Sequence, residues 1–565
     1  MSAFNNKLII GSGMMLTGIS LGHTATIANP VSNGTTSNTD NQKPPNVLVI
    51  MADDLGFSDI SPYGGEIQTP NLKMLAENGV SFTDFSVTPY SAPSRAAFLT
   101  GSDPHDVGLG NLIELSTDEQ KADPNYVGHL NDKALTIAQR LKQAGYFTVM
   151  SGKWHLGTEA ENAPNNWGFD KSFVYLKGDG NHFKRDNYPD GPDGDQPYRL
   201  NGELTDIPDD FYSSTTYADY LMESLNKRPD DKPFFAYLQF TAPHSPLQAP
   251  REDIEKYSDY YLDGPRVLAE QRFKNAKKLN FILESAKQPS MVDVPEWDSF
   301  SEQERQKEIK RMQIYAAMVD NMDANIGRVI DNLRAKGELD NTYIFFFSDN
   351  GAAGKYRETA GRWKDWVNNE HDNSVENMGA ANSYVSQGLG WAQASNMPFS
   401  LFKGYTAEGG IRSPLIVSGP NIPKTKVSGK YSNLTDLAPT ILDIAGVQKT
   451  TPKGKAPLDG ETLMPALTKP ELGKQGPYTS KVLEMNGAKM VRFGDFKALS
   501  NTHRFAGLES DALKTQQWLL YNLAQDPGET TDIADKYPKI LDSLIGYYND
   551  YAKEVGVVEV SPTSR

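Results

Sequence analysis

Acidic and amide side chains follow two separate apolar runs of the chain. Asp53 and Asp54 come after Ala52, at the end of the run 46–51, and Asp349 and Asn350 come after Ser348, at the end of the run 343–347. A single Asp-Asp pair is most often part of a turn. The repeat instead places four oxygen-bearing side chains at the carboxyl ends of two parallel strands, where open α/β sheets bind ligands. Carboxylate and amide oxygens are hard ligands, so the set favours Ca²⁺ or Mg²⁺ over zinc.

A serine and an arginine four residues apart mark the stretch 90–101. Its sequence, YSAPSRAAFLTG, predicts a helix that Ser94 caps and that ends at Gly101. Ser91 then lies just before the helix N-terminus, where free N–H groups and the helix dipole favour an anion. Arg95 adds a positive charge one turn into the helix. Taken alone, the stretch is most simply an ordinary capped helix after a loop.

Basic side chains follow further strand-like runs. Lys153 and His155 come after one of them, and side chains two residues apart at a strand end can both face a cleft. His244 follows the apolar run 234–240 in a proline-rich loop, where a single histidine is usually a satisfied loop residue. Lys403 precedes a Gly-Gly pair that permits a close backbone approach.

The segments that carry these residues resemble the type I sulfatase family, in particular the bacterial arylsulfatases of the alkaline-phosphatase superfamily. The resemblance covers nearly all of residues 46–557. Its motifs are SAPSRAAFLTG at 91–101, GKWHLG at 152–157, APHSPLQAP at 242–250 and DNSVENMG at 372–379. In that family, the first residue of the pattern Cys or Ser, any residue, Pro, any residue, Arg is oxidised after translation. The product is formylglycine, an aldehyde whose hydrate attacks sulfur.

Carried over residue by residue, the resemblance implies two sets of side chains. The ligands of a bound Ca²⁺, with Mg²⁺ the less favoured ion, are Asp53, Asp54, the modified Ser91, Asp349 and Asn350. The side chains around the sulfate are Arg95, Lys153, His155, His244 and Lys403. The single departure among these positions is serine in place of cysteine at position 91.

These residue types suit a sulfate monoester, whose negative charge needs cations that also stabilise the transition-state oxygens. The resemblance implies that the hydrated aldehyde at Ser91 attacks sulfur, polarised by Ca²⁺ and Asp349. His244, together with Lys403, would protonate the departing alkoxide or phenoxide. His155 would take the proton of the second hydroxyl, so that the aldehyde re-forms and sulfate leaves. An unmodified serine has no second hydroxyl, and its sulfate ester would stall.

Two other functions remain open from the sequence. A phosphodiesterase or phosphonate monoester hydrolase of the same superfamily can share the metal ligands and the aldehyde. An unmodified, inactive chain could instead bind sulfated glycans as a module. The physiological sulfate ester, a small molecule or a glycan, is not apparent from the residues.

Composition narrows the class of partner. The chain has 565 residues, a formal net charge of −16 and no cysteine. Such acidity argues against nucleic acid as a partner, because neutralising phosphates requires clustered Lys and Arg. Without cysteine there are no disulfides and no thiol ligand or nucleophile. The aldehyde must therefore come from serine, which implies a serine-type sulfatase-maturing enzyme as a partner during biogenesis.

The N-terminus has the pattern of an export signal. Lys7 precedes an apolar run, 8–21, which small residues follow, so residues 1–28 are interpreted as a signal peptide. Residues 29–45 are rich in Ser, Thr, Asn and Pro and predict a linker. The apolar run is short for a membrane span, and we expect no stable membrane association. The sequence therefore predicts an exported bacterial protein, periplasmic or secreted.

The alternation of apolar runs with amphipathic helices predicts an α/β catalytic domain over 46–453. The resemblance implies an alkaline-phosphatase-like fold, in which helices sandwich a large, mixed, mostly parallel sheet. Short strands and a last helix predict a smaller α+β domain with an antiparallel sheet over 454–565. Residues 178–210 and 368–396 lack clear periodicity and are interpreted as loops at the rim of the cleft.

Overall fold

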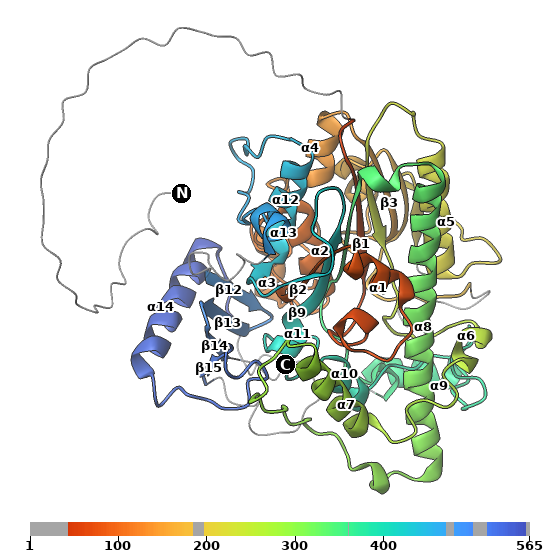
Figure 1. The fold of residues 1–565 in the computed structure, drawn as a ribbon, viewed down its shortest axis with the longest axis vertical. Helices are drawn as coiled ribbons and strands as arrows, with labels where there is room; N and C mark the ends of the chain where they lie inside the picture. The colour runs from red at the N-terminus through yellow and green to blue at the C-terminus, as the bar shows by residue number, and fades with distance from the viewer. Residues whose placement is uncertain (1–42, 185–196, 360, 471–479, 501–516, 561–565) are drawn as a thin grey trace, which may run out of the picture. The chain divides into compact units, whose positions relative to one another are not determined.

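The computed structural model describes most of the chain (Figure 1). The described residues are 43–184, 197–359, 361–470, 480–500 and 517–560. The predicted signal peptide, 1–28, and nearly all of the predicted linker, 29–45, lie outside them. No helix within the described ranges is both long and apolar enough to cross a bilayer.

Eleven strands of the described residues form one large sheet. Its order is β10-β2-β9-β8-β1-β7-β3-β4-β5-β6, with β11 beside β2. At its centre β8 (Thr342–Ser348), β1 (Asn46–Ala52), β7 (Phe234–Gln239) and β3 (Phe147–Lys153) are parallel neighbours. The strands outside this centre are β2 (Gly79–Ser86), β4 (Lys171–Tyr175), β5 (Tyr198–Leu200), β6 (Glu203–Thr205), β9 (Arg412–Ser418), β10 (Lys426–Ser428) and β11 (Ser432–Asn433). β9 runs antiparallel to both of its neighbours, and β5 and β6 continue the far edge antiparallel.

Helices cover both faces of this sheet (Figure 1). One face packs against α1 (Pro70–Glu77), α5 (Ser213–Asn226) and α8 (Glu302–Ala335). The other packs against α2 (Ser91–Thr100), α4 (Ile137–Gln143) and α12 (Leu437–Ile444). Alternate residues of β1 enter the two cores, Leu48 and Ile50 on the first side and Val47 and Val49 on the second. This arrangement confirms the predicted mixed, mostly parallel α/β fold.

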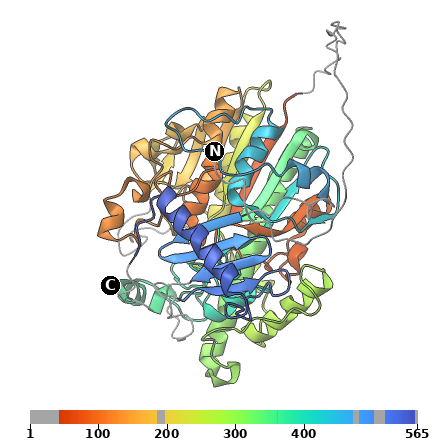
Figure 2. The same ribbon diagram turned by 90° about the vertical axis from the view of Figure 1, so that its left-hand side faces the viewer.

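The C-terminal part carries the predicted antiparallel sheet. Its strands are β12 (Ser480–Met485), β13 (Ala488–Phe493), β14 (Phe496–Ser500) and β15 (Leu519–Asn522), in that order. Helix α14 (Pro538–Glu554) lies across one face of this sheet (Figure 2). The other face packs against residues of the catalytic part, including Phe402 and Ile411. Because Pro44–Arg565 form one compact unit, the domain boundary at 453/454 stays a prediction.

Two segments interpreted as loops contain regular structure. Residues 178–210 carry β5 and β6, which pair at the sheet edge. Residues 368–396 contain α10 (Leu389–Ser395), which buries Trp391. Both predictions were wrong in this respect, because strands of three residues and a helix of seven are too short to show a period. The remaining helices are α3 (Asp118–Lys121), α6 (Arg251–Glu255), α7 (Pro265–Lys278), α9 (Gly361–Glu370), α11 (Glu408–Ile411) and α13 (Met464–Thr468).

Candidate active site

The carboxyl ends of the four central strands bring the polar side chains together. Ala52 at the end of β1 lies beside Ser348 of β8, so Asp53 and Asp349 follow two adjacent strands at the same level. On the other side, Met51 pairs with Gln239 of β7, which precedes the loop of His244. The next strand, β3, ends in Lys153. Parallel register thus gathers residues that are hundreds of positions apart in sequence.

Ser91 is the first residue of α2, not the residue before it. Tyr90 is the N-cap, and Gly101 ends the helix in the left-handed conformation. The predicted cap at Ser94 was therefore wrong. Pro93 can occupy a first turn, so the helix begins earlier than expected. Ser94 Oγ instead donates to the backbone carbonyl of Asp349 at 2.5 Å and so ties the helix to the end of β8.

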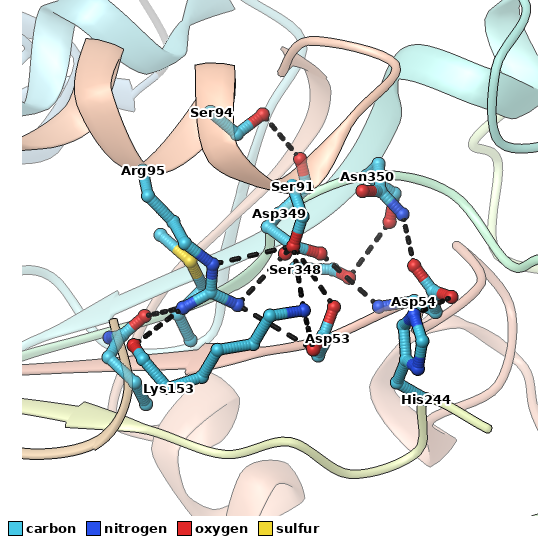
Figure 3. Close-up of polar contacts among 12 residues, drawn as sticks. Asp53, Asp54, Ser91, Ser94, Arg95, Lys153, His244, Ser348, Asp349 and Asn350 are labelled. Atoms are coloured by element: carbon cyan, nitrogen blue, oxygen red, sulfur yellow. Dashed lines mark hydrogen bonds and ion pairs between the residues drawn. The ribbon is translucent and has the colours of Figure 1, made fainter. Parts of the chain in front are cut away.

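Four charged side chains converge on the Ser91 hydroxyl (Figure 3). Its oxygen lies 3.2 Å from Asp53 Oδ1 and also contacts Asp349 Oδ2. Lys153 Nζ donates to it at 3.1 Å and Arg95 Nε at 3.4 Å. Ser91 is only 2% exposed. A small hydroxyl is thus enclosed by two anions and two cations.

The same acidic and basic groups are paired with one another. Arg95 Nη2 donates to Asp349 Oδ2 at 2.9 Å, and Lys153 Nζ donates to Asp53 Oδ2. Arg95 Nη1 reaches Gln239 Oε1 at 2.9 Å and the Lys153 carbonyl at 3.1 Å. The guanidinium therefore has a fixed orientation toward the serine.

Asp54 is the centre of the other half of the cluster. Asn350 Nδ2 donates to Asp54 Oδ1 at 2.6 Å, and Lys403 Nζ donates to the same oxygen at 2.5 Å. His244 Nε2 lies 3.5 Å from Asp54 Oδ2. Asp54 itself has φ = +66°, a left-handed conformation that is costly outside glycine and is often found at functional sites. Tyr315 supports this turn by donating to the Asp54 carbonyl at 3.2 Å.

His155 also adopts a left-handed backbone conformation, at φ = +55°. Burial and the positive charges of Lys153 and Arg95 hold its pKa well below the usual histidine value. Burial likewise lowers the pKa of His244 to about 3, although Asp54 opposes the shift. Both imidazoles are therefore neutral at pH 7, and the charge of the cluster resides in its carboxylates, lysines and arginine.

The carboxylates respond oppositely to their surroundings. Burial and the neighbouring Asp53 raise the pKa of Asp349. Burial would also raise that of Asp54, but Lys403 and His244 bring the Asp54 pKa well below its usual value. The three carboxylates Asp53, Asp54 and Asp349 and the three basic side chains Arg95, Lys153 and Lys403 balance in formal charge. A divalent ion added to this set would leave an excess of positive charge for an anionic substrate.

Two oxygen atoms test whether the cluster could hold such an ion. Asp54 Oδ2 and Asn350 Oδ1 are buried and have no hydrogen-bond partner among the described residues. Asp53, Asp54 and His244 each offer a ligand atom within 4.8 Å of the others. Buried oxygens without a donor are costly unless a cation or water meets them. The donor set therefore fits a hard divalent cation.

Every residue predicted from the sequence lies in or beside this cluster. Two contributors were not predicted. Gln239 orients Arg95 from the end of β7, and Ser348 Oγ accepts from Leu55 N at 3.0 Å. A polar residue as the last member of an otherwise apolar strand is the one signal that could have singled them out.

Comparison with known proteins gives consistent results. The sulfatase family model matches residues 45–447. An uncharacterized sulfatase of Schizosaccharomyces pombe is 40% identical over 541 residues, covering 91% of this chain and 95% of that protein. The arylsulfatase of Klebsiella aerogenes is 38% identical over 425 residues, covering 74% and 90%. Among solved structures, Ps i-CgsB in complex with k-i-k-neocarrahexaose matches with a TM-score of 0.64 at 25% identity, covering 90% of this chain and 93% of that one.

Proposed function

The chain belongs to the sulfatase family and is a sulfuric ester hydrolase, and from this premise we propose how it works. It hydrolyses sulfate monoesters, aryl sulfates among them, to an alcohol or phenol and inorganic sulfate. The nucleophile is a formylglycine hydrate formed from Ser91, and the metal is Ca²⁺. The observation that carries this proposal is the convergence of Asp53, Asp349, Lys153 and Arg95 on one buried serine hydroxyl.

The bound ion would be held by Asp53, Asp54, Asp349, Asn350 and the modified Ser91. These are all oxygen ligands, which suits Ca²⁺ better than softer metals. Such an ion supplies Lewis-acid polarisation of oxygen and compensates the charge that develops at the sulfuryl group. Its ligands are oxygen atoms of side chains that follow β1 and β8 or begin α2.

Some side chains of the site bind and stabilise the negative charge of the sulfate, and others transfer protons. Arg95, Lys153 and Lys403 bind the sulfate oxygens and stabilise their charge in the transition state. One hydroxyl of the hydrated aldehyde at position 91 gives its proton to Asp349, which contacts the Ser91 oxygen, and forms a new S–O bond. The bond from sulfur to the leaving oxygen breaks, and that oxygen is protonated by Lys403 together with His244, with the Lys403 ammonium as the source of the proton. Asp54 contacts both side chains.

The second half of the cycle releases sulfate. His155 takes the proton of the remaining hydroxyl at position 91, and the bond from that carbon to the sulfated oxygen breaks. The aldehyde is restored and inorganic sulfate departs. An unmodified Ser91 cannot undergo this cleavage, since it lacks the second hydroxyl. A serine-type maturing enzyme is therefore a required partner in biogenesis.

The names of related proteins support the substrate class without defining it. One relative is named an arylsulfatase, and one structural neighbour was solved with a neocarrahexaose. The natural ester of this chain is thus either a small molecule or a glycan. The N-terminal pattern supports export to the periplasm or beyond the cell.

The test begins with protein produced with and without a maturase that accepts serine. With the maturase, the peptide containing Ser91 should lose two hydrogens, and 4-nitrophenyl sulfate should be hydrolysed with release of sulfate. Without it, the protein should fold and be nearly inactive. Ser91→Cys should become active in hosts that oxidise only cysteine. The matched control is Ser102→Ala, which removes a buried hydroxyl bonded to Pro457 outside the site.

Three outcomes would overturn the proposal. Full turnover by protein whose Ser91 is unmodified by mass would exclude the aldehyde. Much faster cleavage of bis(4-nitrophenyl) phosphate than of any sulfate ester would make the chain a phosphodiesterase. Fully converted but inactive protein that binds sulfated glycans would make it a binding module.

A further inference from the structure

A second, more exposed group of side chains lies at the rim of the site. Arg357 Nη1 donates to Asp179 Oδ2, and Tyr384 OH donates to the same oxygen at 3.3 Å. The Asp179 carbonyl accepts from Tyr175 OH. The side chains of Arg357 and Asp179 are 30% and 22% exposed, whereas Asp53, Arg95 and Lys153 are almost completely buried. The pair therefore faces outward from the same region.

The neighbours of Asp179 in the chain contact both proposed proton-transfer residues. A methyl group at Gly178 would lie 2.8 Å from His155 Cε1, so the backbone there packs directly on the imidazole. His182 Nε2 lies 3.0 Å from the backbone carbonyl of His244. In the sequence, Asp179 lies between Gly178 and His182, the two residues that make these contacts. The segment 178–182 therefore lies beside both imidazoles.

An aromatic surface adjoins the ion pair. The Arg357 guanidinium carbon lies 5.4 Å from the centre of the Trp363 ring. Trp363 in turn packs on Tyr384 and on Trp366, each at 5.5 Å between ring centres. Trp363 is half-buried, since it lies on the outer α9. The rim thus combines a carboxylate, a guanidinium and an exposed part of an indole.

We propose that Asp179, Arg357 and Trp363 form a leaving-group subsite that recognises a sugar unit carrying the sulfate. A carboxylate accepts from sugar hydroxyls, and a guanidinium offers five N–H donors that can be shared between neighbouring side chains and a ligand. The apolar face of a sugar ring packs against an aromatic ring. An aryl leaving group could use the indole but would leave the two charged groups without hydrogen-bonding partners on the substrate. The inference rests on the proposed sulfatase function.

The experiment compares two kinds of substrate on matured protein. The first is 4-nitrophenyl sulfate, and the second is a panel of monosulfated galactose and N-acetylglucosamine isomers. We expect at least one sugar sulfate to be hydrolysed. For Asp179→Asn, Arg357→Met and Trp363→Ala, the kcat/KM for that sugar relative to 4-nitrophenyl sulfate should fall about 10- to 100-fold. Arg328→Met, which breaks an exposed pair with Asp219, is the matched control and should not change the ratio.

The outcomes separate this inference from the function on which it rests. If matured wild-type protein hydrolyses no sulfate ester, the proposed function itself fails. If it hydrolyses 4-nitrophenyl sulfate but no member of the panel, the sugar subsite is wrong. An equal fall for both substrates in the three variants, or no fall for either, would also overturn the subsite, because recognition of a sugar must change the ratio.

Discussion

Two largely buried clusters of this molecule contain the same charges and differ in what those charges face. The site cluster consists of Asp53, Asp54, Asp349, Arg95, Lys153 and Lys403. The interface cluster, between the large sheet and the C-terminal sheet, consists of Asp84, Glu408, Glu529, Arg412, Arg492 and Lys497. Each has three carboxylates and three cations.

In the interface cluster each charge lies against at least one opposite charge. Arg492 contacts both oxygens of Asp84 at 2.7 Å, and Lys497 Nζ lies 2.7 Å from Glu408 and from Glu529. In the site cluster four of the charged side chains also contact a neutral group, the Ser91 hydroxyl. A balanced set of buried charges can therefore either stabilise the packing of two parts of the protein or take part in catalysis. What marks the site is the convergence of four charged side chains on one small hydroxyl.

The largest effect should come from removing the point of convergence. Ser91→Ala should lower sulfate release from matured protein by about 10⁴-fold or more, because no nucleophile remains. Its thermal midpoint should stay near that of wild type, since no charge loses its counter-charge. Steady-state kinetics and calorimetry measure the two quantities. A large loss of stability with residual activity would mean that Ser91 has a structural role. The site cluster would then not differ from the interface cluster in the way described.

Next in size is the loss of one carboxylate from the site cluster. Asp349→Asn should lower kcat about 10³-fold and weaken Ca²⁺ binding, because asparagine keeps the shape of the side chain but removes the negative charge of the ligand. Isothermal titration of Ca²⁺ into metal-depleted protein measures the affinity independently of turnover. Unchanged Ca²⁺ affinity would remove Asp349 from the ligand set.

The corresponding change in the interface cluster should affect stability and not chemistry. Lys497→Met leaves Glu408 and Glu529 buried without their shared cation, which should lower the free energy of unfolding by about 3–5 kcal/mol. The folded enzyme should keep its kcat/KM. Lys227→Met, in an exposed pair with Glu223, is the control and should cost about 1 kcal/mol or less. A fall in kcat/KM without loss of stability would contradict the division between the clusters.

The smallest expected effect concerns His105, a buried histidine outside both clusters, which contrasts with His244 of the site cluster. His105 lies 2.9 Å from Asp103 and 3.1 Å from Glu484. Burial would lower its pKa, but these carboxylates raise the pKa of His105 to about 10, in contrast to His244. The stabilisation is complete below the unfolded pKa of about 6.5 and disappears as pH rises through about 10. We expect a loss of about 2–4 kcal/mol over this interval.

Denaturant unfolding of wild type and His105→Gln between pH 6 and 10 checks this expectation. The difference between the two proteins should shrink as the pH rises. His129→Gln, which removes a histidine bonded to a neighbouring carbonyl, should keep the wild-type profile. A difference between wild type and His105→Gln that is the same at every pH would show that the histidine is not charged in the fold.

The sequence predicted the central strands and the acidic part of the cluster for one physical reason. A fully buried strand is a continuous apolar run, and the first polar residue after it has to lie at the sheet edge. Asp53, Asp54, Asp349 and Asn350 were located in this way, whereas His244 was assigned to the site through the family resemblance. The sequence did not predict the short edge strands β5 and β6, because a strand of three residues shows no period. It also misplaced Ser94, because a helix start near a proline leaves no periodic signal.

Contacts made by side chains from distant loops were beyond such reasoning. Arg357 and Asp179 are 178 positions apart, and no pattern in either segment indicates the other. Gln239 was likewise hidden, since it belongs to the strand and not to the residues after it. These contacts depend on how loops fold over the sheet, which tertiary packing decides.

The burial of Ser91 sets an order of events in the life of the protein. The chain that encloses this hydroxyl includes Asp349, which is 258 residues farther along. During synthesis, Ser91 therefore leaves the ribosome long before the groups that cover it. Once they are in place, only 2% of the residue is reachable from outside. An enzyme that carried out the proposed oxidation of Ser91 would have to act before these groups cover the hydroxyl, so slower folding would lengthen the time available to it and rapid folding would shorten it.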